Sequence, residues 1–262
     1  MRTARTRLAI LALLLVLLAG GATLIARRVF VQRGRGGLGN SGQTGITRTV
    51  QATATTGRQG AYYLPQDYQT RALPLLVMLH GTGGKGSLML LRLRALAERE
   101  RFIAIAPDSV NIAGAWLVGQ RPNEVTEDYR HVMGCVREVL ALPDVRVDRA
   151  HVLIAGFSVG GSAAPYIASH EDLFTAFAVL HGHLVLEGMG PRRVRGWLST
   201  GDGDRLRTVD YIRRVGDDMT RREGFPEVET RAFPVAHTLG EDELTALVAW
   251  WLHRQDSGAA QR

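Results

Sequence analysis

The clearest structural signal in this sequence is HVLIAGFSVGGSAAPYIAS, residues 151–169. Residues 152–155 form a short apolar run rich in branched side chains, which predicts a buried strand. GFSVG, residues 156–160, follows without a gap, and the small residues after it allow a helix to start close against a sheet. A strand, a G-x-S-x-G turn and a helix in this order predict that Ser158 has a strained backbone and an exposed hydroxyl at the carboxyl edge of the sheet.

This turn predicts nucleophilic chemistry at Ser158. Side chains at Gly156 and Gly160 would collide across so tight a turn, and the backbone N–H of Val159 would point at the oxygen of an attacked carbonyl group. The alternative is a glycine-rich turn without a catalytic role, because the motif is short and the chain contains 30 glycines. A nucleophilic serine also requires an oxyanion loop earlier in the chain, and an acid and a histidine later.

A second glycine-rich loop lies before the serine. Residues 74–79, PLLVML, read as a central strand covered on both faces, and HGTGG, residues 80–84, follows them. Such loops hold the ligand sites of α/β proteins, so we expect Thr82 to donate the second oxyanion N–H and Gly83 to lie at the substrate. The alternative is a phosphate-binding loop, although no G-x-x-x-x-G-K-[ST] is present. We expect His80 to shape the loop rather than to act as the base.

An acid and a histidine follow Ser158 in the required order. GDGD, residues 201–204, comes directly after a predicted strand. We expect Asp204 to be the acid, with Asp202 as the second candidate and an ordinary turn as the alternative. His237 lies in the loop after the last predicted strand. Its position after both Ser158 and Asp204 favours a role as base over that of a surface histidine.

Alternating strand and helix patterns predict an α/β fold. The predicted strands lie at residues 49–55, 61–64, 74–79, 102–106, 152–155, 174–180, 194–200 and 228–233, and the helices between or after them at residues 88–101, 125–142, 208–222 and 241–253. This order predicts a mostly parallel, doubly wound sheet with helices on both faces. The chain passes from Leu180 to Val194 without room for a cap domain.

Three further features near these loops have two interpretations each, and the single cysteine has one. Trp116 is expected to line the substrate pocket, with packing in the core or at the surface as the alternative. Asp128 either holds loops near the site or is a solvated carboxylate in the first turn of a helix. His181-Gly182-His183 suggests a metal site, but no third ligand at a suitable spacing is visible, so we expect a strand-end loop and no metal. Cys135 is the only cysteine and is expected in the core.

The N-terminus predicts a targeting segment. Residues 8–26 carry no charge and are flanked by arginines on both sides. Their length approaches the ~20 residues of a membrane-spanning helix, so residues 1–28 are expected to form a single anchor or a cleaved signal peptide. Residues 29–47, rich in Gly, Ser and Asn, read as a flexible linker. The catalytic domain is expected over residues 48–255 and a disordered tail over residues 256–262. The expected location is membrane-anchored or exported, in the periplasm or outside the cell.

The charge distribution argues against a nucleic-acid partner. The formal net charge is +7, but the first 60 residues contain nine arginines and no acidic residue. The rest of the chain contains 23 basic and 25 acidic residues and is nearly neutral. The basic character therefore belongs to the N-terminal arm, and the domain carries no basic surface excess for nucleic acid.

With these motifs, the chain resembles the α/β-hydrolase superfamily, and within it the polyhydroxybutyrate-depolymerase and feruloyl-esterase type of secreted esterase. The resemblance spans about residues 50–253 and is carried by LPLLVMLHGTGG, VRVDRAHVLIAGFSVGG, and GDGD followed by a late histidine. It implies Ser158 as nucleophile, Asp204 as acid, His237 as base, and oxyanion N–H groups from Thr82 and Val159.

The resulting hypothesis is a serine hydrolase that cleaves carboxylic esters through an acyl-enzyme, without a metal or organic cofactor. The substrate is expected to be a small ester or the exposed end of a polymer, because no cap would enclose a long acyl chain. Two alternatives stay open: hydrolysis of another acyl bond, as in a peptidase or thioesterase, and a catalytically silent hydrolase-fold binding module. The sequence makes no prediction of the oligomeric state.

Overall fold

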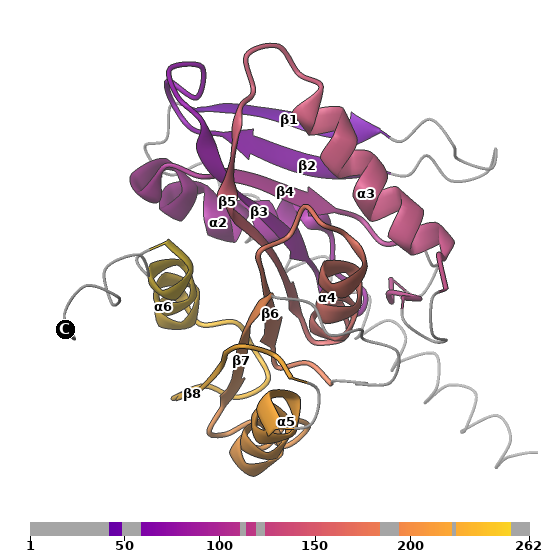
Figure 1. Ribbon diagram of the computed structural model, residues 1–262, viewed down its shortest axis with the longest axis vertical. Helices are drawn as coiled ribbons and strands as arrows, with labels where there is room; N and C mark the ends of the chain where they lie inside the picture. Colours follow the sequence, from indigo (N-terminus) through magenta and orange to yellow (C-terminus); the bar gives the residue numbers. More distant parts are fainter. Residues whose placement is uncertain are drawn as a thin grey trace, which may run out of the picture. The chain divides into compact units, whose positions relative to one another are not determined.

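The computed structural model describes residues 42–48, 59–110, 114–118, 124–183, 194–221 and 224–252. These residues form an eight-stranded sheet in the order β1-β2-β4-β3-β5-β6-β7-β8 (Figure 1). The strands are β1 (Gln43–Arg48), β2 (Gln59–Leu64), β3 (Leu73–Leu79), β4 (Ile103–Pro107), β5 (Val147–Phe157), β6 (Ala176–Leu180), β7 (Arg195–Gly201) and β8 (Val228–Phe233). Strand β1 is antiparallel to β2, and β2 is antiparallel to β4. The other six strands, which are β4, β3, β5, β6, β7 and β8 in their order across the sheet, are parallel to one another.

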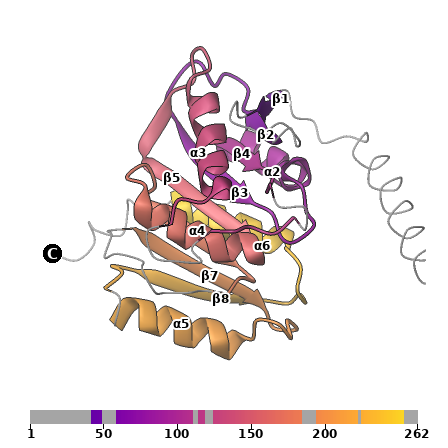
Figure 2. The same cartoon turned by 90° about the vertical axis from the view of Figure 1, so that its right-hand side faces the viewer.

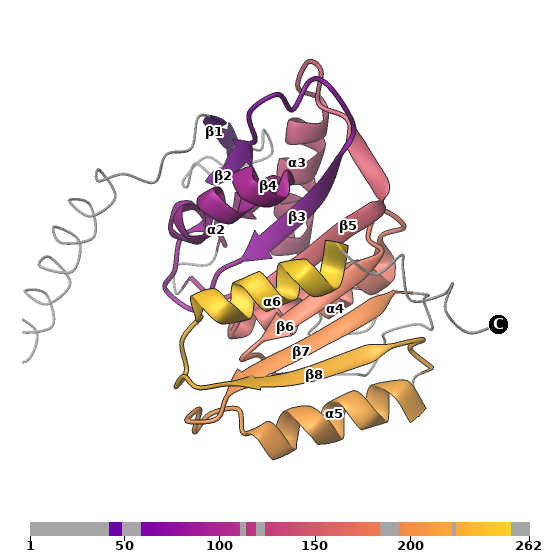
Figure 3. The same cartoon turned by 90° about the vertical axis from the view of Figure 1, so that its left-hand side faces the viewer.

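In the described part of the chain, five helices cover the two faces of the sheet. They are α2 (Gly86–Glu100), α3 (Glu127–Leu140), α4 (Val159–His170), α5 (Val209–Arg221) and α6 (Glu241–Leu252). Helices α3, α4 and α5 pack on one face, and α2 and α6 pack on the other (Figures 2 and 3). Alternate residues of β3 pack into the cores on the two faces. Leu75 and Val77 lie in the core under α3, α4 and α5, and Leu76 and Met78 lie in the core under α2 and α6. The predicted doubly wound, mostly parallel sheet is confirmed.

The parallel strands bring the loops that follow them to one edge of the sheet. All strands from β3 to β8 point the same way, so the loops after β3, β5, β6, β7 and β8 meet at their carboxyl ends. This edge is where doubly wound sheets bind their ligands. The loops contain residues that are far apart in the sequence, from His80 to His237.

The linker was predicted over residues 29–47, and its C-terminal boundary is wrong, because residues 43–47 belong to β1. This strand pairs with β2 along its whole length. Its glycines do not make it flexible here: Gly45 lies opposite Tyr62, and the backbone N–H of Gly42 donates to the Tyr63 hydroxyl at 3.0 Å. Small residues let these rings lie close over the strand. The composition therefore resembles that of a linker although the segment is an edge strand.

Several predicted segments lie outside the described residues. These are the N-terminal segment 1–28, the first part of the linker, the strand at residues 49–55 and the tail at residues 256–262. Part of the connection from β6 to β7, residues 184–193, also lies outside them. Among the helices that the structure describes, none is both long and apolar enough to cross a membrane.

Candidate active site

The turn between β5 and α4 holds Ser158 in an unusual backbone conformation, with φ 54° and ψ −119°. Non-glycine residues rarely adopt a positive φ, so this turn is strained. It is held by a hydrogen bond from the Ser158 N–H to the carbonyl of Leu180 at 2.8 Å. A Cβ at Gly156 would collide with the backbone of Gly160, and a Cβ at Gly160 would lie 2.6 Å from the carbonyl oxygen of His80. The sharp turn thus depends on both glycines of the motif.

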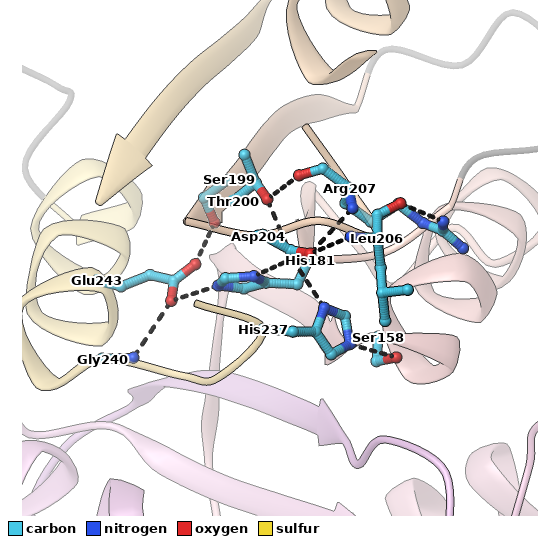
Figure 4. A network of polar contacts seen from close by, with 10 residues as sticks. All are labelled: Ser158, His181, Ser199, Thr200, Asp204, Leu206, Arg207, His237, Gly240 and Glu243. Carbon is cyan, nitrogen blue, oxygen red and sulfur yellow. Dashed lines mark hydrogen bonds and ion pairs between the residues drawn. The ribbon is translucent and has the colours of Figure 1, made fainter. Parts of the chain in front are cut away.

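The structure brings Ser158, His237 and Asp204 into one hydrogen-bonded row (Figure 4). Nε2 of His237 lies 3.1 Å from Oγ of Ser158, and Nδ1 lies 2.7 Å from Oδ2 of Asp204. The His237 side chain is 26% exposed, whereas that of Asp204 is fully buried. The end of the row at Ser158 is therefore accessible to solvent, whereas the carboxylate of Asp204 is shielded from it.

Two backbone hydrogen bonds join the loops that carry the acid and the histidine. The N–H of Asp202 donates to Phe233, and the N–H of Gly203 donates to Val235. These bonds fix the distance between Asp204 and His237, which come from the loops after β7 and β8. Of the two predicted acids, Asp204 is the one that contacts His237, and Asp202 is exposed.

Asp204 accepts an unusually large number of hydrogen bonds. Oδ1 accepts from the backbone N–H groups of Leu206 and Arg207, at 2.7 and 3.0 Å, and Oδ2 accepts from two histidine rings. Burial by itself would raise the pKa of Asp204, but the bonds from His181, His237 and the backbone outweigh it and lower the pKa well below its ordinary value. Asp204 is therefore a permanent anion at neutral pH.

The HGTGG loop lies next to Ser158. A Cβ at Gly81 would lie 3.4 Å from Cβ of Ser158, so the two backbones approach closely. Gly83 has a φ of 69°, and its N–H donates to the carbonyl of Gly114 at 3.2 Å, so this N–H is used inside the loop. Thr82 is exposed and Val159 is half-buried. Thr82 and Val159 stay the predicted oxyanion donors, whereas the Gly83 N–H serves the loop.

Buried polar groups support this loop from behind. His80 donates from Nδ1 to the Gly81 carbonyl at 2.7 Å and accepts the Ser109 N–H on Nε2 at 3.0 Å, an arrangement that requires the neutral ring. Burial lowers the pKa of His80 in agreement with this. Asp128 is buried and accepts from the N–H groups of Val110 and Leu117, so it holds loops rather than facing solvent.

Trp116 also lies behind the loop, where we expected it to line the pocket. Its side chain is only 4% exposed, and its Nε1–H donates to the carbonyl of His80 at 2.7 Å. A buried indole N–H needs such a partner, and the carbonyl at the base of the HGTGG loop supplies it. Trp116 is therefore a support of the loop and not a surface for substrate.

Two residues of this site were not predicted from the sequence. His181, interpreted only as part of a strand-end loop, is fully buried with Nδ1 at 2.7 Å from Oδ2 of Asp204. Glu243 in the first turn of α6 is also buried, and its Oε2 lies 3.3 Å from Nε2 of His181 (Figure 4). The position of His181 at a strand end was a usable signal. Nothing in the sequence distinguishes Glu243 from the neighbouring acidic residues of its helix.

His181, Asp204 and His237 also bring three possible metal-ligand atoms within 4.8 Å of one another. Their spacing fits hydrogen bonds better than an ion. Each Nδ1 lies 2.7 Å from the same carboxylate oxygen, whereas ligands of a tetrahedral zinc with bonds of about 2.0 Å would be separated by about 3.3 Å. The two histidines are therefore arranged as proton donors around one acceptor, the carboxylate of Asp204.

This geometry can activate a hydroxyl group. His237 is positioned to take the proton of Ser158, and Asp204 holds the ring with Nε2 towards the serine. The HGTGG loop approaches Ser158 closely at Gly81, and α4 begins at Val159, directly after the serine, so backbone N–H groups of both segments are candidate oxyanion donors. Such groups can stabilise the negative charge that develops on an attacked carbonyl oxygen.

Comparison with known proteins shows where the fold occurs. No family model and no curated protein matches the sequence. Among solved structures, the chain is similar to fluorophosphonate-binding serine hydrolase F of Staphylococcus aureus, with a TM-score of 0.63, 14% identity, and 80% of this chain and 98% of that chain covered. A ferulic acid esterase gives a TM-score of 0.58 at 17% identity, covering 81% and 97%.

A third similar structure is the acylaminoacyl peptidase of Pyrococcus horikoshii, with a TM-score of 0.58 and 15% identity. The match covers 82% of this chain but only 39% of that chain. At such identities the similarity shows a shared fold. Proteins with this fold cleave more than one kind of acyl bond, so the fold does not select the substrate.

Proposed function

We propose that this chain, which has the α/β-hydrolase fold, hydrolyses carboxylic esters through a covalent acyl-enzyme on Ser158. One observation carries the proposal: Nε2 of His237 lies 3.1 Å from Oγ of Ser158 while Nδ1 contacts the buried Asp204. A nucleophile, a base within hydrogen-bond reach and a third group that orients the base form the arrangement expected for nucleophilic catalysis.

In the proposed reaction, Oγ of Ser158 attacks the ester carbonyl as its proton passes to Nε2 of His237. The backbone N–H groups of Thr82 and Val159 stabilise the oxyanion, each contributing on the order of 10²–10³ in rate. His237 then gives its proton to the departing alcohol, and a water molecule releases the acid by the same steps in reverse. Asp204 stays ionised throughout and stabilises the positive ring of His237.

The proposed substrates are esters with short acyl groups or the exposed ends of polymers. The short connection from β6 to β7 in the sequence supports this, because it leaves no room for a cap over the serine. The peptidase among the similar structures keeps a peptide bond as the second candidate. A panel of acetyl, butyryl and long-chain p-nitrophenyl esters, thioesters and peptides would separate the candidates, and a strong preference for long acyl chains would contradict the open site.

The decisive experiment is labelling of the full-length chain with a fluorophosphonate, together with hydrolysis of p-nitrophenyl acetate. We expect the wild type to label and turn over, and Ser158→Ala to do neither. Ser169→Ala is the matched control, because Ser169 is a buried serine of α4 whose hydroxyl contacts the carbonyl of Tyr166 and Nδ1 of His170 rather than the residues around Ser158. A folded wild type that neither labels nor hydrolyses would favour the silent binding module.

We further propose that the protein is membrane-anchored or exported. The support is the uncharged segment at residues 8–26 with arginines on both sides. In that case the esterase domain would act outside the cytoplasm on esters that reach the cell surface or periplasm.

A further inference from the structure

A second histidine lies on the far side of the candidate acid. His181 follows β6 and is fully buried, and its Nδ1 contacts the same oxygen of Asp204 at the same distance as His237, 2.7 Å. Its other nitrogen, Nε2, faces Oε2 of Glu243 at 3.3 Å. His181 therefore bridges two carboxylates that are both fully buried (Figure 4).

This bridge requires two protons on the His181 ring. A neutral imidazole has one N–H, so one of its nitrogens would direct a lone pair at a carboxylate oxygen. Both oxygens of Glu243 are placed as acceptors: the Ser199 hydroxyl donates to Oε1 at 2.6 Å and the Gly240 N–H approaches Oε2 at 3.4 Å. Two buried carboxylates without a cation would be costly. A charged His181 supplies that cation and hydrogen-bonds both.

The surroundings of the ring favour the charged form. Burial by itself disfavours it, but the contacts with Glu243 and Asp204 outweigh burial and raise the pKa of His181 above its ordinary value. The ring packs against Phe157 of β5, Asp204 after β7, His237 after β8 and Glu243 of α6. Within the described part of the chain, His237 is thus the one further titratable group that faces it, with ring centroids 5.5 Å apart.

Building on the esterase proposed above, we propose that His181 is an imidazolium that acts as a positioning residue, and that its charge keeps His237 in its basic form to lower pH. Two effects lead to this role. The cation shares the Oδ2 atom of Asp204, so it weakens the pull of that carboxylate on a proton at His237. It also repels a second positive charge on the neighbouring ring. Both effects favour the neutral His237 that accepts the proton of Ser158.

The first test is the pH dependence of kcat/KM in Glu243→Gln. This substitution keeps the side-chain shape but removes the charge that holds the second proton on His181. We expect the acidic limb of the profile to move to higher pH by about half a unit to two units. This is the effect on His237 of losing one unit charge from the His181 ring, 5.5 Å away. The lower figure applies at the dielectric constant of water, and the higher one at an effective dielectric constant of about 20.

His151→Gln is the matched control for this shift. His151 contacts Asp148 at 2.7 Å, the same distance, but on β5 away from Ser158. We expect its acidic limb to coincide with that of the wild type. Should Glu243→Gln fail to fold, Ser199→Ala replaces it, since it removes one donor to Glu243 and should shift the limb in the same direction by less. An acidic limb that does not move in a folded variant would overturn the proposal.

The second test needs no activity. In the full-length chain labelled with ¹⁵N-histidine, NMR at neutral pH should show protons on both ring nitrogens of His181, assigned by their loss in His181→Gln. A single protonated nitrogen would overturn the proposal. A chain that hydrolyses no ester would overturn the proposed function and the effect on His237, whereas the NMR signals would still decide the charge of His181.

Discussion

Ser158 keeps its strained backbone because its neighbours have no side chains to obstruct the turn. The cost of a positive φ at a non-glycine residue is of order 1–3 kcal/mol and has to be offset by surrounding contacts. The N–H of Ser158 is bonded to Leu180, and the helix that begins at Val159 continues directly from the turn. The conformation of the candidate nucleophile therefore depends on Gly156 and Gly160.

Gly160→Ala tests this dependence. Its Cβ would lie 2.6 Å from the carbonyl oxygens of His80 and Leu79, and backbone atoms cannot give way cheaply. We expect a loss of about 1–3 kcal/mol in unfolding free energy and a clear loss of kcat. Urea denaturation and ester hydrolysis measure the two effects. Gly203→Ala is the control, since its Cβ would have ordinary contacts at 3.4 Å or more, and equal effects in both variants would contradict the argument.

Asp204 should make stability depend on pH. Its pKa is lower in the folded protein than the ~3.9 of an unfolded chain, so its contribution is present above about pH 4 and is lost as the pH falls through the folded value. We expect Asp204→Asn to lose about 3 kcal/mol at pH 7, because it leaves buried donors without their anion. Urea unfolding between pH 7 and pH 3 should show this difference shrinking towards low pH. A difference that stays constant would count against a buried anion.

At the scale of elements, the HGTGG loop is held by groups that come from other parts of the chain. Trp116 and Ser109 bond to His80, and Asp128 of α3 holds the segments that contain them. The loop after β3 is thus supported by the start of a helix on one face of the sheet. A loop that donates an oxyanion hydrogen bond benefits from such support, because its donor must not move during the reaction.

Trp116→Phe should loosen this loop. It removes the donor to the His80 carbonyl, which costs about 1–3 kcal/mol if that carbonyl is left unsatisfied. We expect kcat to fall by about tenfold, less than the 10²–10³ for loss of an oxyanion donor. Trp197→Phe is the matched control, because the buried Nε1–H of Trp197 has no hydrogen-bond partner among the residues that the structure describes. Comparable losses of kcat in both variants would refute the specific role of Trp116.

β1 should contribute to stability despite its glycine content. It pairs with β2 over six residues, and its Arg48 N–H donates to the carboxylate of Glu138 on α3 at 2.9 Å. We expect a chain that starts at Gly42 to unfold at a higher urea concentration than one that starts at residue 49. The shorter chain should also aggregate, since it exposes the edge of β2. Equal urea midpoints would mean that β1 is dispensable.

At the scale of the whole molecule, the arrangement of strands explains how distant residues form one site. The candidate nucleophile, acid and base follow β5, β7 and β8, and the HGTGG loop follows β3. Because these strands are parallel, their ends lie at one edge. The charge of the chain is distributed unevenly along the sequence, because the excess of basic residues lies within the first 60 residues.

The N-terminal arm should determine where the protein resides. We expect the full-length chain to be recovered with membranes or as an exported, shortened form, and a chain that starts at Gly42 to remain in the cytosolic fraction. Cell fractionation with mass determination of the N-terminus distinguishes an anchor from a cleaved signal. A full-length, uncleaved chain in the cytosol would refute the proposed location.

Sequence patterns predicted the sheet, the serine turn and the order of the acid and base, but not every residue around them. The turn is predictable because strand, glycines and helix are adjacent in the chain. The preference for Asp204 over Asp202 agrees with its contact to His237, although both residues follow the same strand. The position of Trp116 behind the loop was mispredicted, because a lone tryptophan carries no periodic signal that tells core from pocket.

By itself, the sequence determined the α/β class, the strained serine turn and the basic arm, because each depends on neighbouring residues or on composition. Only the tertiary structure decided that residues 43–47 form an edge strand and that His181 and Glu243 belong to the site. The reason is distance along the chain: β1 needs the tyrosines of β2, and His181 meets Glu243 only after α6 has packed against the sheet. Such contacts depend on how faces pack, and no local pattern encodes them.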